Sequence, residues 1–176
     1  MHRLVAHPAH PPRKVRDVRV RWSVLPSGSL MLRWRVDGAE DVVMPPYAGS
    51  GRADELWRTT CFELFLSDSG GRYREFNFSP SGQWAAYEFS SYRHLTGNYR
   101  LGDPPFLEVQ KGETIATATV RLPVDTLDGA HAAGFSVVIE EEGGHLSYWS
   151  VVHRREKPDF HDPACFVIRF AAAEQS

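Results

Sequence analysis

Residues 60–89 read TCFELFLSDSGGRYREFNFSPSGQWAAYEF, and this stretch decides the fold because apolar and polar side chains alternate along it. The alternation runs through residues 60–66, 73–79 and 83–89. A period of two is that of a β-strand with one buried face. The interruptions SDSGG and PSG contain the Gly, Pro, Ser and Asp residues that favour tight turns. The stretch therefore predicts three consecutive strands joined by two turns.

The alternation gives these strands two different faces. Phe62, Leu64 and Leu66 share one face of the first strand, and Phe76 and Phe78 share one face of the second, so we expect both faces in the core. The opposite faces mix carboxyl, amide and aromatic groups: Cys61, Glu63 and Phe65 in the first strand, and Tyr73, Glu75, Asn77 and Ser79 in the second. Pairing of the two strands is expected to bring Glu63 close to Glu75 or Asn77.

The rest of the chain follows the same pattern. Further strands are predicted at 18–24, 30–36, 107–111, 115–122, 135–141, 146–152 and 166–170, with one helical turn at 123–127. Many short strands separated by turn signals are typical of an all-β sandwich of two antiparallel sheets. We expect a Pro-rich N-terminal arm at residues 1–14, a single domain at 15–171 and a tail at 172–176. Trp22 and Trp34 belong to alternating strands and are predicted to lie in the core.

The composition favours an ordinary globular domain. Hydrophobic residues make up 42% of the 176 residues, charged residues make up 24%, and the net charge is −2. Without an overall basic field, we expect neither nucleic acid nor a membrane as partner. The N-terminus lacks the apolar run of a signal peptide, so a cytoplasmic location is expected, with Cys61 and Cys165 as reduced thiols. The sequence leaves a bridge between these cysteines open, and also the oligomeric state.

The polar sheet face indicates a site for a small polar ligand. Aromatic rings stack on the C–H faces of sugars, while carboxylates and amides bond their hydroxyl groups. The rings and carboxyl groups of residues 60–89 have this character, and so has the later segment SYWSVVHRREKPDFH at 147–161. The residues alone thus predict a binding face and leave its ligand open.

The strings LWRTTCFELFL at 56–66 and YREFNFSPSGQWAAYEF at 73–89, with SYWSVVH and KPDFH downstream, resemble bacterial DOMON-like domains, which are similar to family 9 carbohydrate-binding modules. The resemblance extends over roughly residues 15–170. It implies a β-sandwich that binds either a sugar, clamped between Trp rings, or haem, held by Met and His. We therefore predict a non-catalytic domain that binds a carbohydrate, without a metal or cofactor. The predicted ligand-binding residues are Trp57, Trp84 and Trp149 as stacking walls, Glu63, Glu75 and Asn77 as hydrogen-bonding groups, and Arg58, His153 and Lys157 at the rim.

Other interpretations remain open at this point. A haem-binding domain would draw axial ligands from Met31, Met44 and His153. A glycoside-acting hydrolase would use Glu63 and Glu75 as paired carboxylates, or Cys61 and His153 as nucleophile and base. His153 and His161 with Asp159 or Asp162 match no sharp metal motif. Arginines at 19, 21, 33 and 35 form either a solvated sheet face balanced by acids or a patch for an anionic group on a ligand.

Overall fold

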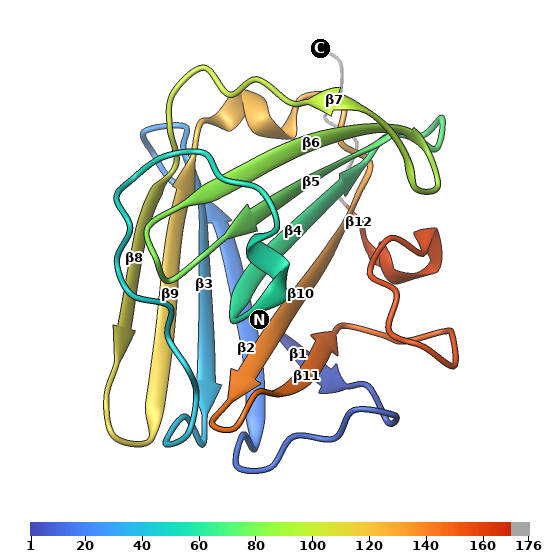
Figure 1. The fold of residues 1–176 in the computed structure, drawn as a ribbon. Coiled ribbons are helices and arrows are strands. Elements are labelled where there is room, and N and C mark those ends of the chain that lie inside the picture. Colours follow the sequence, from blue (N-terminus) through green and yellow to red (C-terminus); the bar gives the residue numbers. More distant parts are fainter. Residues whose placement is uncertain (170–176) are drawn as a thin grey trace.

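The computed structural model describes residues 1–169 and has an all-β fold, which confirms the predicted class (Figure 1). The described residues contain no α-helix, only three short 3₁₀ turns. The strands are β1 His2–Ala6, β2 Asp17–Val24, β3 Leu30–Asp37, β4 Cys61–Ser67, β5 Tyr73–Phe78, β6 Trp84–Ser91, β7 His94–Asn98, β8 Phe106–Lys111, β9 Ile115–Leu122, β10 Ala132–Glu141, β11 His145–Ser150 and β12 Ile168–Arg169. The 3₁₀ turns are η1 Leu56–Arg58, η2 Val124–Leu127 and η3 Pro163–Cys165.

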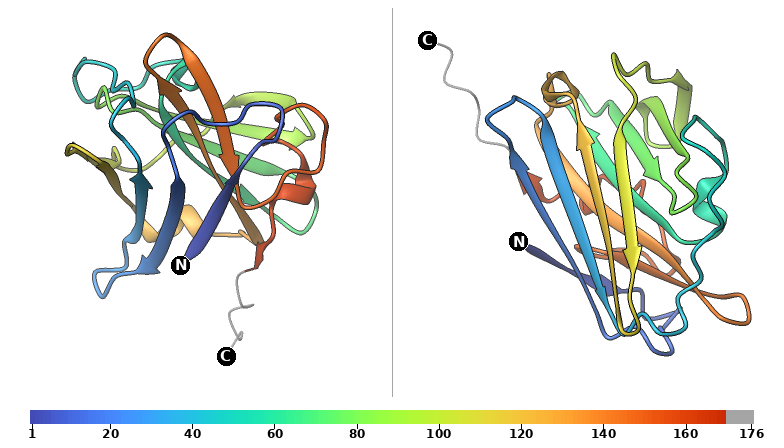
Figure 2. Two further views of the ribbon diagram at one scale, coloured as in Figure 1. Left: turned by 90° about the horizontal axis from the view of Figure 1, so that it is seen from below. Right: turned by 90° about the vertical axis from the view of Figure 1, so that its left-hand side faces the viewer.

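The strands form one continuous hydrogen-bonded path instead of two separate sheets. Its order is β7-β6-β5-β4-β10-β11-β1-β2-β3-β9-β8, and β12 pairs with β10. Strand β1 joins the two parts because it pairs with β11 on one side and with β2 on the other. We call β7-β6-β5-β4-β10-β11 the pocket half and β2-β3-β9-β8 the arginine half. The two halves lie face to face (Figure 2).

The main core fills the space between the halves. Phe62, Leu64 and Leu66 of β4 pack there with Phe76 and Phe78 of β5, as the alternation predicts. The arginine half contributes alternating Val, Leu and Ala residues from β2, β3 and β9. Its Trp34 ring is fully buried and lies 5.6 Å from the ring of Phe62 and 6.3 Å from that of Phe78. One face of every central strand therefore packs in the core.

The N-terminal segment differs from the predicted Pro-rich arm. Residues 2–6 form strand β1, and Leu4 is buried in the main core. Further along, the backbone N–H groups of residues 13–15 donate to the carboxylate of Glu141, which is fully buried. The pairing of β1 with β11 and the contacts of residues 13–15 with Glu141 join segments more than 100 residues apart, beyond the reach of local patterns. The predicted tail at 172–176 lies outside the described residues.

The outer face of the arginine half follows the predicted cross-strand pattern. Arg19 lies directly opposite Arg35, and Arg21 lies opposite Arg33. Like charges in directly opposed positions destabilise a sheet. Two carboxylates offset this repulsion at one end, since Asp17 pairs with Arg19 and Asp37 pairs with Arg35. The arginines therefore form a solvated face on the side of the molecule away from the core.

Candidate functional site

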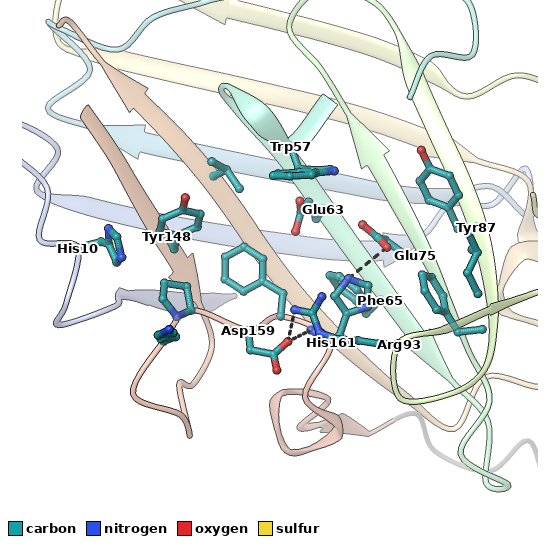
Figure 3. Close-up of a pocket in the computed structure, with 16 residues that line it drawn as sticks. His10, Trp57, Glu63, Phe65, Glu75, Tyr87, Arg93, Tyr148, Asp159 and His161 are labelled. Atoms are coloured by element: carbon teal, nitrogen blue, oxygen red, sulfur yellow. Dashed lines mark hydrogen bonds and ion pairs between the residues drawn. The ribbon is translucent and has the colours of Figure 1, made fainter. Parts of the chain in front are cut away.

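A cavity of about 670 Å³ lies on the outer face of the pocket half, on the opposite side of that layer from the main core. Its floor consists of side chains from β4, β5 and β6, with β10 and β11 at one flank. The C-terminal loop, which we define as residues 151–167, and the turn between β6 and β7 form the remaining wall. Figure 3 shows side chains from these elements converging on one space.

Strand alternation and register place the floor residues. Phe62, Leu64 and Leu66 point to the core, so Glu63 and Phe65 must point outward on the same strand. Cross-strand partners share a face, and Phe65 lies opposite Glu75, which in turn lies opposite Tyr87. Three neighbouring strands thereby present a row of one phenylalanine, one carboxyl group and one phenol. Glu63 stands beside this row, directly opposite Asn77.

Glu63 is buried at the floor with a single hydrogen-bonding side chain. Its carboxyl group is 2% exposed, and Ser136 of β10 donates a hydrogen bond of 2.8 Å to its Oε2. Burial, which removes water from the charged form, and the nearby charge of Glu75 together raise the pKa of Glu63 to about 8. The hydrogen bond from Ser136 opposes this shift only in part. Near neutral pH, Glu63 is therefore mostly protonated.

Glu75 has a similar environment on the next strand. It is 6% exposed, and the amide Nδ2 of Asn77 donates to its Oε1 over 3.0 Å. Burial raises the pKa of Glu75 to about 7, while the Asn77 hydrogen bond and the positive charge of Arg93 oppose the shift. The two carboxyl groups thus share a cavity floor and hold their protons up to neutral pH.

His161 of the C-terminal loop stands beside Glu75 as a neutral ring. Its Nδ1 lies 2.9 Å from the hydroxyl oxygen of Tyr73, which accepts a hydrogen bond from the backbone N–H of Arg93. The other ring nitrogen, Nε2, lies 3.6 Å from Glu75 Oε2. Burial lowers the pKa of His161 to about 4, with Arg93 acting in the same direction. At neutral pH this contact is not an ion pair.

Arg93 and Asp159 form a compensated pair in the cavity wall. The Arg93 Nη2 lies 2.9 Å from Asp159 Oδ1, and the hydroxyl of Tyr92 donates to Oδ2. Burial alone raises the pKa of Asp159, but the hydrogen bonds from Tyr92 and Arg93 outweigh it and hold the pKa below its ordinary value. Asp159 balances part of the Arg93 charge, which still acts on Glu75 and His161.

Aromatic rings supply most of the remaining wall. Trp57 comes from η1 and is 49% exposed at the mouth, above Glu63 in the view of Figure 3. The other aromatic side chains of the lining are Phe65, Tyr87, Phe89, Tyr148 and Phe160. The hydroxyl of Tyr87 donates 2.7 Å to Asp54, which fixes that ring at the cavity edge. A cavity with this lining can pack apolar surface and bond polar groups at its floor.

The structure brings some of the predicted residues together at this cavity. Trp57, Glu63, Glu75 and Lys157 line it, with Lys157 exposed at the rim. Asn77 is fully buried beside the two carboxyl groups and reaches the cavity only through its hydrogen bond to Glu75. These five positions come from β4, β5, η1 and the C-terminal loop.

The other four predicted residues lie elsewhere. Trp84 is directly opposite Phe78 and packs against the main core, so it shares the core face of its strand. Trp149 is 4% exposed within the same core, and its neighbour Tyr148 lines the cavity in its place. Both corrections follow from the same rule, since adjacent strand residues point to opposite faces.

Arg58 and His153 are also outside the lining. Arg58 is exposed and pairs with Glu55, 2.6 Å away. His153 has its Nε2 3.0 Å from the carbonyl oxygen of Val5, and its ring meets that of His7 edge-on at 4.8 Å. It thereby links the C-terminal loop to strand β1. Its role in the described structure is to position the loop.

Sequence reasoning missed Tyr87, Arg93, Tyr148 and His161 as lining residues. Register could have found Tyr87, because the position opposite Glu75 must share its face. Strand alternation could have found Tyr148 once Trp149 was placed in the core. Arg93 and His161 lie in irregular segments, and no periodic pattern points to them.

The alternative chemistries find no assembled site among residues 1–169. Met31, Met44 and His153 do not line the cavity, so these candidates do not fit a haem between two axial ligands there. The described residues contain no group of three or more His, Cys, Asp or Glu able to hold a metal ion. Cys61 and Cys165 are free and buried. Burial raises the pKa of the Cys61 thiol well above its ordinary value, the opposite of what a nucleophile needs.

Within the described part of the chain, no helix has the length and apolar character needed to cross a membrane. No protein-family model matches the chain, and no curated protein matches it. The fold is similar to that of a crystal structure from Bacteroides uniformis, which is named a "putative carbohydrate-binding protein". The two share 20% sequence identity with a TM-score of 0.65, over 94% of this chain and 83% of the other. At that identity the likeness establishes a common fold.

Proposed function

We propose that the cavity on the pocket half binds a small carbohydrate without converting it. The observation that supports this most is the pair of buried carboxyl groups, Glu63 and Glu75, at the floor of an aromatic-walled cavity. A protonated carboxyl group both donates and accepts hydrogen bonds, as sugar hydroxyls do. The surrounding rings offer flat apolar surface for the C–H face of a sugar.

The size of the cavity and the similarity in fold also support carbohydrate binding. A volume of about 670 Å³ is within the range of small-molecule sites and accommodates a mono- or disaccharide. The half-exposed Trp57 at the mouth is placed to stack on a ring that occupies the space above Glu63. The fold-level likeness to a protein named for carbohydrate binding adds weak support. A DOMON-like domain similar to family 9 modules is the class we propose.

Thermal unfolding with a panel of mono- and disaccharides tests this function. A ligand at ten times its dissociation constant adds about 1.4 kcal/mol to the free energy of unfolding. For a domain of this size the expected rise in Tm is roughly 3–6 °C. Trp57→Ala should abolish the rise, whereas Tyr47→Ala, which removes an exposed ring outside the cavity, should leave it unchanged. A full shift in Trp57→Ala, or no shift with any saccharide, would contradict the proposal.

A glycoside-acting hydrolase is the second candidate, because two carboxyl groups share the cavity floor. Hydrolysis needs one protonated acid and one ionised base or nucleophile. Burial raises the pKa of both Glu63 and Glu75, so one of the two can keep the proton that the acid role requires while the other ionises. Release of 4-nitrophenol from a panel of 4-nitrophenyl glycosides, lost in Glu75→Gln, would establish catalysis. Binding of the same glycosides without release would rule it out for them.

A further inference from the structure

The carboxyl groups at the cavity floor accept their side-chain hydrogen bonds from neutral groups. Ser136 is the hydrogen-bond donor to Glu63, and Asn77 is the donor to Glu75. No Lys or Arg of residues 1–169 forms an ion pair with either group, and the His161 contact of Glu75 is made by a neutral ring. Two acidic side chains thus share the floor, almost out of reach of water, without an ion pair to Lys or Arg of the described residues, and Arg93 acts on Glu75 only as a more distant charge.

A third acceptor adds to this surplus. Asn77 lies opposite Glu63 and uses its amide N–H to bond Glu75, while its fully buried Oδ1 has no hydrogen-bond partner among the described residues. A buried carbonyl oxygen without a donor is costly and contributes negative potential. This oxygen therefore adds an unpaired acceptor beside the two carboxyl groups, which favours a ligand that brings hydrogen-bond donors.

The aromatic walls of the cavity also favour binding of a cation. The faces of Trp and Tyr rings attract ammonium groups, most strongly where water is excluded. Trp57, Tyr87 and Tyr148 lie around the floor carboxyl groups from three different elements (Figure 3). Carboxyl groups beneath such rings provide both the charge and the polarisable surface that a desolvated ammonium needs.

We propose that the ligand is an amino sugar whose ammonium group binds between Glu63 and Glu75. This inference rests on the proposed function, because it assigns the substrate class of the same cavity. The ammonium has three N–H donors, enough to serve both carboxylates, and it supplies the ion pair that neither carboxylate has with a Lys or Arg of residues 1–169. A neutral sugar would leave two acids in their present protonated form and would gain no charge interaction.

The other titratable groups around the floor do not change the preference for a positively charged ligand group. The groups that face the pair are Cys61 of β4, Tyr73 of β5, Tyr87 of β6, Tyr148 of β11, His10 of the N-terminal segment, and Arg93, Lys157, Asp159 and His161 of the wall and rim. Arg93 is paired with Asp159, and Lys157 is exposed at the rim. The phenols and the thiol are uncharged at neutral pH, because burial raises the pKa of each of Cys61, Tyr73, Tyr87 and Tyr148.

Proton release gives the inference a direct signature. Binding of an ammonium ionises carboxyl groups that were protonated, so each bound ligand should displace about one proton or more near pH 6.5. Linkage then makes the affinity for the amine rise up to tenfold per pH unit for each proton released, from pH 5.5 to pH 7. A sugar without an amine should release no proton and show a flat profile.

Isothermal titration calorimetry of the full chain with D-glucosamine, D-glucose and N-acetyl-D-glucosamine tests this. At pH 6.5, in two buffers of different ionisation enthalpy, glucosamine should bind at least tenfold more tightly than the other two and release protons. Glu63→Gln keeps the shape of the protonated acid and should remove both the preference and the proton release. Glu75→Gln serves as the second variant, and Glu113→Gln, an exposed loop residue, as the matched control.

Cyclohexylamine and cyclohexanol separate the inference from the proposed function. If glucose or N-acetylglucosamine binds as tightly as glucosamine, the amine assignment is overturned while carbohydrate binding stands. If cyclohexylamine binds but no sugar does, the cation site is supported and the carbohydrate function fails. If neither the sugars nor the amine binds, both are overturned.

Discussion

At the position of Glu63, an uncharged side chain would make the folded protein more stable. It is buried on a central strand of the pocket half, and ionisation there has no compensating cation within the described residues. Such an arrangement costs stability and is typical of residues retained for binding or chemistry. The proposed binding of an ammonium group therefore depends on whether Glu63 holds its proton in the folded protein.

The pH dependence of stability tests this. A folded-state pKa of about 8 lies above the ordinary value of 4.5, so the folded chain retains a proton that the unfolded chain loses. The resulting stabilisation is present at low pH and is lost as the pH rises toward 8, and Glu75, with a pKa of about 7, acts in the same direction. Between pH 6.5 and 8 the free energy of unfolding should fall by roughly 1 kcal/mol per pH unit for each retained proton.

Urea denaturation of the wild type and of Glu63→Gln at pH 6.5, 7.25 and 8 measures this slope. The variant should show a shallower fall, because glutamine cannot ionise. His161, whose pKa is lowered to about 4, contributes equally to both proteins and therefore cancels in the comparison of slopes. Equal slopes for both proteins would mean that Glu63 is already ionised in the folded state.

Individual residues also show what the sequence could and could not predict. The faces of Phe62, Glu63 and Glu75 follow from alternation alone and are as predicted. Trp84 required the register of β5 against β6, which places it opposite Phe78 on the core side. The position of the His161 ring depends on a contact with the hydroxyl of Tyr73, 88 residues away in the chain. Long-range contacts of that kind leave no local pattern.

Among the elements of the site, the C-terminal loop is the one that sequence patterns predict least. The same loop forms part of the cavity wall. Its sequence, rich in Pro, Asp and Arg, contains no periodic signal. The loop is held by tertiary contacts: Arg155 pairs with Asp162, and the carbonyl of Arg155 lies 3.0 Å from the Nε2 of His7. The strands, in contrast, were predicted to within a few residues, apart from β1 and β7, because their alternation is strong.

Gly134 of β10 lets this loop dock closely on the sheet. A Cβ atom at Gly134 would lie 2.8 Å from Cδ1 of Phe166 and 3.3 Å from the carbonyl oxygen of Cys165. Gly134→Ala should therefore lower the free energy of unfolding by about 1–3 kcal/mol through overpacking, and weaken saccharide binding because His161 and Asp159 move with the loop. Gly102→Ala, where a Cβ would meet nothing within 4 Å, is the control. Unfolding curves and titrations that are equal for both variants would contradict the close docking.

At the scale of the whole molecule, strand β1 makes the two halves one structure. It supplies the hydrogen-bonded link between β11 and β2, and Leu4 fills part of the core between the halves. A sandwich of two separate sheets would not need this strand. Local patterns do not predict this strand, because HRLVA is short and is followed by a Pro-rich segment.

Two substitutions on β1 test its place in the core. Leu4 is 1% exposed and Val5 is 46% exposed on the same strand. Leu4→Ala should cost about 2–5 kcal/mol of unfolding free energy, as expected for a truncated core leucine, while Val5→Ala should stay within about 0.5 kcal/mol. Chemical denaturation of both variants measures the difference. Equal stabilities would mean that β1 is a peripheral arm, as the sequence first indicated.

The central claim is that a saccharide binds on the outer face of the pocket half, and an amide NMR titration of the ¹⁵N-labelled protein tests it most directly. D-glucosamine, D-glucose and N-acetyl-D-glucosamine would be added in turn. The account predicts that at least one of them shifts the amide signals of Glu63, Glu75, Tyr87 and His161 while those of Arg21 and Arg33 stay unchanged. Shifts centred on the arginine half, or no shifts with any of the three, would contradict it.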